Sequence, residues 1–119
     1  MWETLNQRKF PRLNIKCDIE VSGPRNAFAF STVTQNIGAG GVCVILPREL
    51  SRSVPVHLKL YLRKDQSPVE CSGRVCWNIG SRTLFKSKRQ FDTGIEFVDI
   101  PPEHRETIRM IVAEGLEGR

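Results

Sequence analysis

A strict alternation of apolar and polar residues over positions 54–63 constrains the fold more than any other feature. Every second residue from Val54 to Leu62 is valine or leucine, and proline, histidine, lysine and tyrosine stand between them. Successive side chains of a strand point to opposite faces, so this pattern predicts a β-strand with one buried face. His57 is then expected on the solvent face as an ordinary strand histidine.

Five shorter runs of the same kind extend this prediction to most of the chain. They cover residues 14–21, 27–35, 42–46, 69–77 and 93–98, and turn-forming residues separate them. Six short strands without intervening helices indicate an antiparallel barrel or sandwich. A chain of 119 residues can bury one modest core, so we expect a single, mainly β domain.

The C-terminal segment breaks the strand pattern. Two prolines open it, and a stripe at helical spacing follows: His104, Ile108, Ile111 and Val112. The stripe predicts a helix over about residues 101–114 that packs on the β domain, with Gly115 as its stop. A contact with a protein partner or a second copy of the chain, giving a homodimer, is the other use of such a stripe.

Charge and composition favour an anionic partner in the cytoplasm. The formal net charge is +5, and basic residues gather at positions 8–12 and 82–89. No run of apolar residues is long enough to span a membrane, and residues 1–15 lack the apolar core of a signal peptide. The four cysteines lack CxxC spacing, so we expect reduced thiols and no metal site.

Two short motifs carry the functional interpretation. Arg8 and Arg12 stand four residues apart before the first predicted strand, and Asn36 opens the sequence NIGAGG, which ends at Gly41. This ordered pair resembles the cyclic di-GMP site of PilZ domains, where RxxxR precedes D/NxSxxG. Gly38 stands where that family usually has serine.

Two further segments share the resemblance: SGRVCW at residues 72–77 and TGIEF at residues 93–97 are similar to late strands of the family. The resemblance implies a PilZ-like antiparallel β-barrel of six to seven strands with a C-terminal α-helix. It divides the chain into an N-terminal arm, residues 1–13, which carries RxxxR, and a barrel with its helix, residues 14–119.

The resemblance also implies a ligand, the bacterial second messenger cyclic di-GMP, and a set of ligand-binding residues: Arg8, Arg12, Asn36, Gly38, Gly41 and Trp77. The planar arginine fork can donate two parallel hydrogen bonds to guanine or phosphate. The Asn36 carbonyl can accept from guanine N1 or N2, the glycines allow backbone conformations closed to other residues, and Trp77 can stack on a base.

We further expect the arm to become ordered over the barrel when ligand binds, and so to relay the signal to a protein effector. Residues 1–12 contain only three large apolar groups, Trp2, Leu5 and Phe10, which are too few to bury a stable element of their own.

Three other interpretations stay open. Gly38 allows a PilZ-like adaptor that binds protein without nucleotide, and the net charge with Trp77 allows a nucleic-acid-binding barrel, although nucleic acid is not the expected partner. The triplet Asp92-Thr93-Gly94 matches the catalytic triplet of aspartic proteases, but Ile95 follows it and no second signature is present. GAGG precedes an apparent strand rather than the helix of a phosphate-binding loop, so we expect no enzyme.

Overall fold

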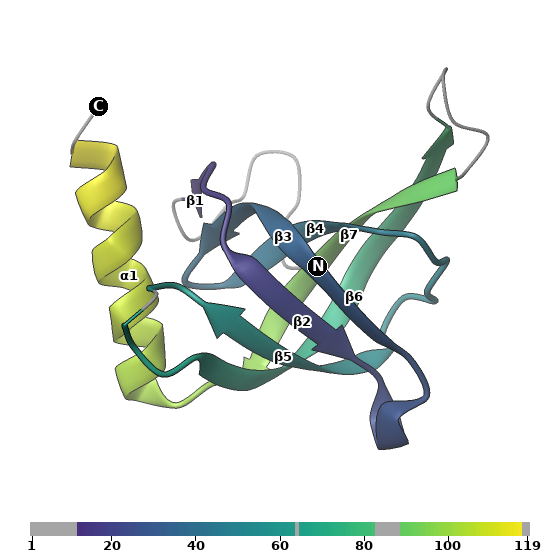
Figure 1. The fold of residues 1–119 in the computed structure, drawn as a ribbon, viewed down its shortest axis with the longest axis horizontal. Coiled ribbons are helices and arrows are strands. Elements are labelled where there is room, and N and C mark those ends of the chain that lie inside the picture. Colours follow the sequence, from purple (N-terminus) through teal and green to yellow (C-terminus); the bar gives the residue numbers. More distant parts are fainter. Residues whose placement is uncertain (1–11, 64, 83–88, 118–119) are drawn as a thin grey trace.

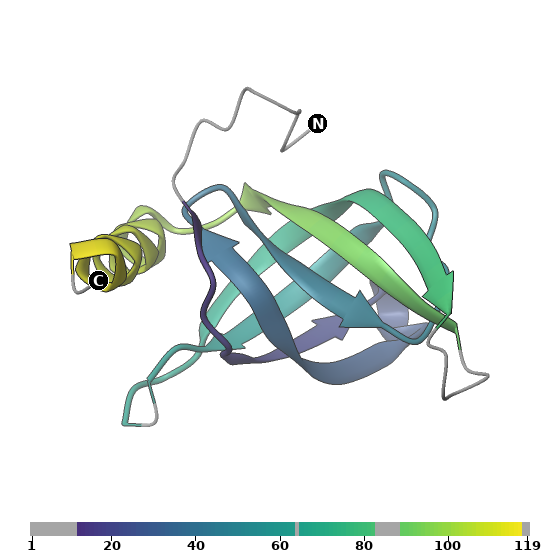
Figure 2. The ribbon, with the colours of Figure 1, turned by 90° about the horizontal axis from the view of Figure 1, so that it is seen from above.

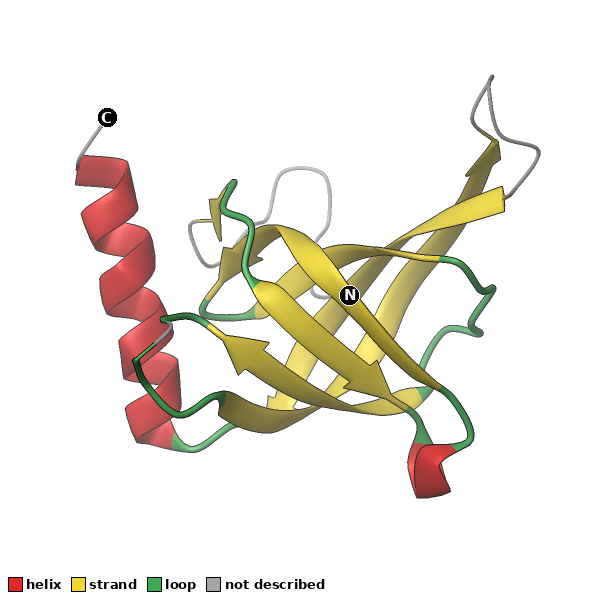
Figure 3. Cartoon of the chain, viewed as in Figure 1, coloured by secondary structure: helices red, strands yellow, loops and turns green. Residues whose placement is uncertain are grey.

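The computed structural model describes residues 12–63, 65–82 and 89–117. One short 3₁₀ turn, η1 (Pro24–Asn26), and one long helix, α1 (Pro102–Glu117), accompany the strands (Figure 3). The strands are β1 (Arg12–Leu13), β2 (Asp18–Ser22), β3 (Ala29–Gly38), β4 (Gly41–Leu46), β5 (Pro55–Tyr61), β6 (Val69–Arg82) and β7 (Arg89–Asp99).

Six of the strands close a ring. They pair in the order β3-β2-β5-β6-β7-β4, and β4 pairs with β3 again; every pairing is antiparallel. β1 pairs with β3 outside this ring. Figures 1 and 2 show the strands wrapped around a common interior with α1 beside one end. The predicted antiparallel β-barrel with a C-terminal helix is confirmed.

The interior follows the alternation in the sequence. In β5, Val56, Leu58 and Leu60 are buried, and the core continues through apolar residues of β2, β4 and β7. His57 lies on the exposed side, where its Nε2 is 3.2 Å from Glu70 Oε1, as predicted for a strand histidine.

α1 closes one end of the core. Ile108 and Val112 are 1% and 2% exposed, and they belong to the same cluster as the barrel interior. Gly115 is not the stop that the sequence suggests, because the helix continues to Glu117. Its role is close packing: a Cβ at Gly115 would lie 2.2 Å from Leu13 Cδ2. Across the described ranges, no helix is both long and apolar enough to cross a membrane.

The first predicted strand, residues 14–21, is interrupted in the structure. Residues 14–17 leave the ladder between β1 and β2, and the buried Thr34 of β3 takes the place of the missing backbone bonds. Thr34 Oγ1 donates to the Ile15 carbonyl at 2.7 Å and accepts from the Cys17 amide at 2.9 Å. One hydroxyl therefore holds β1 and β2 against the same strand.

The end of the predicted arm pairs with the barrel. Arg12 and Leu13, the last two residues of the predicted arm, belong to the sheet as β1, and Leu13 is 6% exposed. Residues 1–11 of the arm lie outside the described part of the chain.

β6 and β7 also differ from their predicted lengths. They extend as a paired hairpin to Arg82 and from Arg89, beyond the predicted ends at residues 77 and 93. Backbone pairing sustains this extension, and Ile79 in it is 61% exposed.

We expect Thr34→Val to destabilise the fold by about 2–4 kcal/mol, because it leaves a carbonyl and an amide at the β1–β2 break without their partner. Chemical denaturation measures the change. Thr107→Val removes a hydroxyl that bonds only to Glu103 O on an exposed helix turn, and it should change stability by less than about 0.5 kcal/mol. An unchanged denaturation midpoint for Thr34→Val would contradict the assigned role.

Candidate functional site

A bulge in β3 turns Asn36 to the outside of the barrel. The β3–β4 register passes from Thr34 opposite Val44 to Asn36 opposite Cys43, so Gln35 is an extra residue. Thr34 and Val44 are fully buried inside the barrel. Simple alternation from Thr34 would point Asn36 inward as well, and the extra residue reverses that direction.

A second bulge does the same for Trp77 in β6. Val75 lies opposite Ile95 in the interior, whereas Trp77 lies opposite Gly94, which leaves Cys76 as the extra residue. Trp77 is therefore outward-facing and half-buried. The sequence alone did not decide between a core tryptophan and a surface platform, and the structure places it on the surface.

The two bulges align a continuous row of outward residues across four neighbouring strands. Asn36 pairs with Cys43, Cys43 with Gly94, and Gly94 with Trp77. The adjacent outward row contains Arg12, Gly38, Gly41, Glu96 and Arg74. We call the outward side of β1, β3, β4, β7 and β6 that carries these two rows the site face.

The two halves of the predicted ligand site meet on the site face. Arg12 Nη1 donates to Asn36 Oδ1 at 3.3 Å, although the residues are 24 positions apart. β1 positions the arginine by pairing Arg12 with Gly38. Of the six predicted site residues, five lie together here. Arg8 lies outside the described residues.

Three glycines without side chains occupy the centre of the site face. Gly38, Gly41 and Gly94 occupy outward positions between Arg12 and Trp77, and all three are buried. No glycine in the described ranges has a positive φ, so the expectation that they adopt conformations closed to other residues is wrong there. Their contribution is the absence of a side chain. A Cβ at Gly94 would lie 2.4 Å from the indole of Trp77, so the ring packs against the bare backbone.

The site face also contains charged residues that sequence reasoning missed. Arg74 Nη1 lies 3.7 Å from Glu96 Oε1 across β6 and β7, and Cys43 Sγ donates to Asp92 Oδ1 at 3.0 Å. Asp92 belongs to a pocket of about 290 Å³ lined by Gln35, Asn36, Cys43, Ile45, Gln90 and Asp92. The strand register brings them to this face, whereas neither sequence motif includes them.

The structure also gives the Asp92-Thr93-Gly94 triplet a structural explanation. Thr93 is fully buried, donates to Phe91 O at 3.0 Å and accepts from Asn78 Nδ2 at 2.9 Å. Gly94 accommodates the Trp77 ring. Asp92 and Gly94 point outward and Thr93 inward, as successive residues of one strand do.

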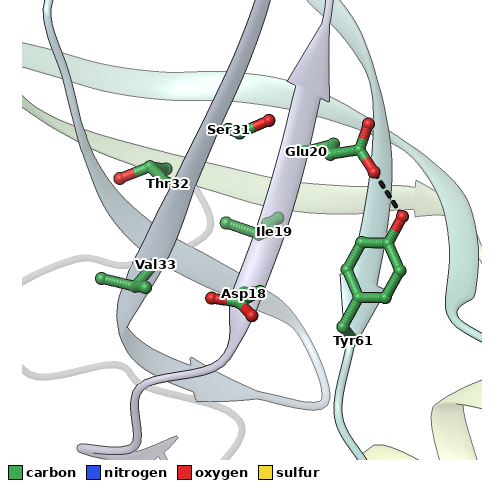
Figure 4. Close-up of a pocket in the computed structure, with 7 residues that line it drawn as sticks. All are labelled: Asp18, Ile19, Glu20, Ser31, Thr32, Val33 and Tyr61. Carbon is green, nitrogen blue, oxygen red and sulfur yellow. Dashed lines mark hydrogen bonds between the residues drawn. The ribbon is translucent and has the colours of Figure 1, made fainter. Parts of the chain in front are cut away.

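A second pocket, of about 610 Å³, lies on β2, β3 and β5 (Figure 4). It contains two carboxylates, Asp18 and Glu20, and Tyr61 donates its hydroxyl to Glu20. This bond, with the nearby negative charge, raises the pKa of Tyr61. This pocket is larger than the one beside Asp92, but its acidic lining disfavours an anionic ligand. The arginines of the site face attract such a ligand.

Burial keeps two of the four thiols protonated at neutral pH. It raises the pKa of Cys71 to about 12, and it raises that of Cys17 as well. These cysteines are part of the packing rather than of a reactive centre. Within the described ranges, no group of three or more histidine, cysteine or acidic side chains is arranged to hold a metal ion.

Comparison with known proteins identifies the architecture. A family model described as the PilZ domain matches residues 6–114. No curated protein matches the sequence at a significant level.

Three solved structures illustrate the fold similarity. The Bacillus subtilis inhibitor of motility (MotI/DgrA) superposes with a TM-score of 0.77 and 15% identity, over 97% of this chain and 54% of that chain. The PilZ domain of YcgR from Escherichia coli with c-di-GMP superposes with a TM-score of 0.71 and 10% identity, over 95% of this chain and 94% of that chain. The K. pneumonia MrkH–c-di-GMP complex superposes with a TM-score of 0.72 and 16% identity, over 96% of this chain and 54% of that chain. The chain thus spans about half the length of MotI and of MrkH, and identities this low establish the fold alone.

We expect Gly94→Ala to displace Trp77 from the site face, because the added methyl group would lie 2.4 Å from the ring. In a Trp2→Phe background, the fluorescence of Trp77 should shift to longer wavelength, and stability should fall by about 1–3 kcal/mol. Gly80→Ala is the matched control, since its nearest neighbour is the end of the flexible Arg89 side chain at 2.7 Å. Identical emission in Gly94→Ala and the Trp2→Phe parent would show that the ring does not depend on this glycine.

Proposed function

The chain belongs to the PilZ domain family, and from this premise we propose that it binds cyclic di-GMP on the site face. The observation that carries the proposal is the hydrogen bond from Arg12 Nη1 to Asn36 Oδ1. This bond joins the two motifs next to Gly38 and Gly41. The family's domains are non-catalytic, which favours a receptor over an enzyme. The similar structures of YcgR and MrkH contain c-di-GMP, which supports the choice of ligand.

Arginine is the residue type that this ligand requires. Cyclic di-GMP carries two phosphodiester charges and two guanines, and a guanidinium can donate two parallel hydrogen bonds to either group. Asn36 orients Arg12 through a neutral amide, which does not cancel its charge. Arg8, four residues earlier, supplies a second guanidinium in this proposal.

The surface between these arginines suits a flat base. Gly38 and Gly41 present backbone without side chains, so a guanine can approach the main chain closely. Trp77 offers an aromatic ring at the opposite border, and stacking on such a ring contributes about 1–3 kcal/mol per base. The proposed ligand-binding residues are therefore Arg8, Arg12, Asn36, Gly38, Gly41 and Trp77.

Gly38 weakens the proposed site without removing it. The serine that the family usually has there would contribute one hydroxyl hydrogen bond, worth about 1 kcal/mol, or roughly a five- to tenfold change in affinity. The remaining contacts come from side chains and backbone that Gly38 does not alter. The site face thus retains both proposed cationic contacts and the base platform.

The proposed output is a change at the N-terminal arm that a protein effector recognises. β1 fixes the end of the arm at Arg12, next to Asn36 and the glycines. A ligand that also engages Arg8 would draw the preceding residues onto the site face. Ordering of a segment by ligand contacts is a known means of creating a new binding surface.

We expect Arg12→Ala and Arg8→Ala each to weaken cyclic di-GMP binding by about tenfold or more, because each removes a charge-assisted hydrogen bond. Isothermal titration calorimetry measures the affinity, and Arg12→Lys should fall between Arg12→Ala and the wild type, since it retains charge but loses the planar fork.

Arg109→Ala is the control, because Arg109 is exposed on α1 and pairs with Glu106, away from the site face. Wild-type affinity in both arginine-to-alanine variants would refute the clamp. Absence of binding by the wild-type protein would refute the proposed function and favour the adaptor interpretation.

We expect hydrogen exchange to slow most at residues 7–11 and 36–41 when cyclic di-GMP is added, with little change in β5 on the far side of the ring. The physical reason is that the ligand supplies contacts that the arm lacks in its own sequence. Uniform protection of the barrel, or none in the arm at saturation, would contradict the relay even if binding were confirmed.

A further inference from the structure

We propose that the pocket between β3, β4 and β7 receives the Watson–Crick edge of one guanine and that Asp92 selects guanine over adenine. This inference rests on the proposed binding of cyclic di-GMP, and it assigns a subsite and a specificity-determining residue outside the two motifs.

The pocket is an extension of the site face. Its lining residues are Gln35, Asn36, Cys43, Ile45, Gln90 and Asp92, and its volume is about 290 Å³. Asn36 and Cys43 belong to the row that crosses the site face, and Ile45 pairs with Asp92 one step further along the same strands. A base that enters this pocket therefore stays within reach of Asn36 and of the arginine that Asn36 orients.

The polar groups of the pocket match guanine. The Gln35 and Gln90 amides can donate to O6, and Asp92 is the one carboxylate in the lining. Guanine N1–H and N2–H point in the same direction, so a single carboxylate accepts both. Adenine carries an acceptor at N1, which the carboxylate repels. A site with this charge rejects adenine more strongly than neutral amides would.

Asp92 is held in place for this role. Cys43 Sγ donates to its Oδ1 at 3.0 Å. A carboxylate offers about four acceptor positions, so one weak thiol bond leaves capacity for a ligand. Asn36 Oδ1 accepts from Arg12 and keeps a second lone pair, but a neutral amide cannot form a charge-assisted bond to the base. The charge-assisted contact to the base therefore falls to Asp92.

The test is a titration of the wild-type protein and Asp92→Asn with cyclic di-GMP, cyclic di-IMP and cyclic di-AMP. Cyclic di-IMP lacks the exocyclic amine of guanine and is otherwise the same ligand. We expect the wild type to prefer cyclic di-GMP over cyclic di-IMP by about tenfold or more and to discriminate further against cyclic di-AMP. In Asp92→Asn, cyclic di-GMP should bind about 10- to 100-fold more weakly, and its preference over cyclic di-IMP should largely disappear.

Asp99→Asn is the matched control, because Asp99 is an exposed aspartate on the same strand and is not part of the pocket. It should retain both the affinity and the preference. Thermal unfolding of each variant separates lost binding from lost fold. As a second variant, Cys43→Ala should weaken cyclic di-GMP binding less than Asp92→Asn, since it releases the carboxylate without removing it.

Two outcomes overturn the inference in distinguishable ways. If the wild type binds cyclic di-GMP in an Arg12-dependent manner and folded Asp92→Asn keeps the full preference over cyclic di-IMP, Asp92 does not select the base and the proposed function stands. If the wild type binds no cyclic dinucleotide, both the proposed function and the guanine subsite are refuted.

Discussion

The Thr34 hydroxyl is the interaction on which the arrangement of the site depends. It accepts from the Cys17 amide and donates to the Ile15 carbonyl, so it joins β3 to both sides of the break that separates β1 from β2. Thr34 is also the last interior residue before the bulge that turns Asn36 outward. One buried polar group thus supports both partners of the Arg12–Asn36 hydrogen bond.

Close packing against glycine provides the second layer of support. Leu13 follows Arg12 in β1, and its side chain packs against Gly115 of α1. The helix therefore does more than cover one end of the core, because it buries the residue next to the site arginine. On the other side of the site face, Gly94 allows the Trp77 ring to lie against the sheet. At both positions a larger residue would fill the space that a functional neighbour or its support occupies.

The sequence predicts the barrel well because burial in β2 and β5 follows simple alternation, which period-two patterning reports directly. It predicts Arg12 and Asn36 as a pair only through the resemblance of two motifs. The bulges at Gln35 and Cys76 could not be predicted, because an extra residue changes the facing of its neighbours without changing composition. Cys43, Asp92 and Arg74 were missed because they lie outside the two motifs, and only the pairing of distant strands brings them to the same face. The helix stop was misplaced because Gly115 serves packing rather than termination.

Charge is distributed over the barrel in a way that separates two surfaces. The outward side of β2 and β5 carries Asp18 and Glu20, with Tyr61 bonded to Glu20, and this surface repels anions. On the site face, Glu96 accompanies Arg74, whereas Arg12 is oriented by a neutral amide.

An acidic residue at position 36 would orient Arg12 and also neutralise part of its charge. Asparagine keeps the orientation without adding a negative charge beside Arg12. A carboxylate can then act elsewhere on the face, at Asp92, where its partner is a weak thiol donor rather than an arginine. The separation of cation and carboxylate lets the same surface bind phosphate at one position and a guanine edge at another.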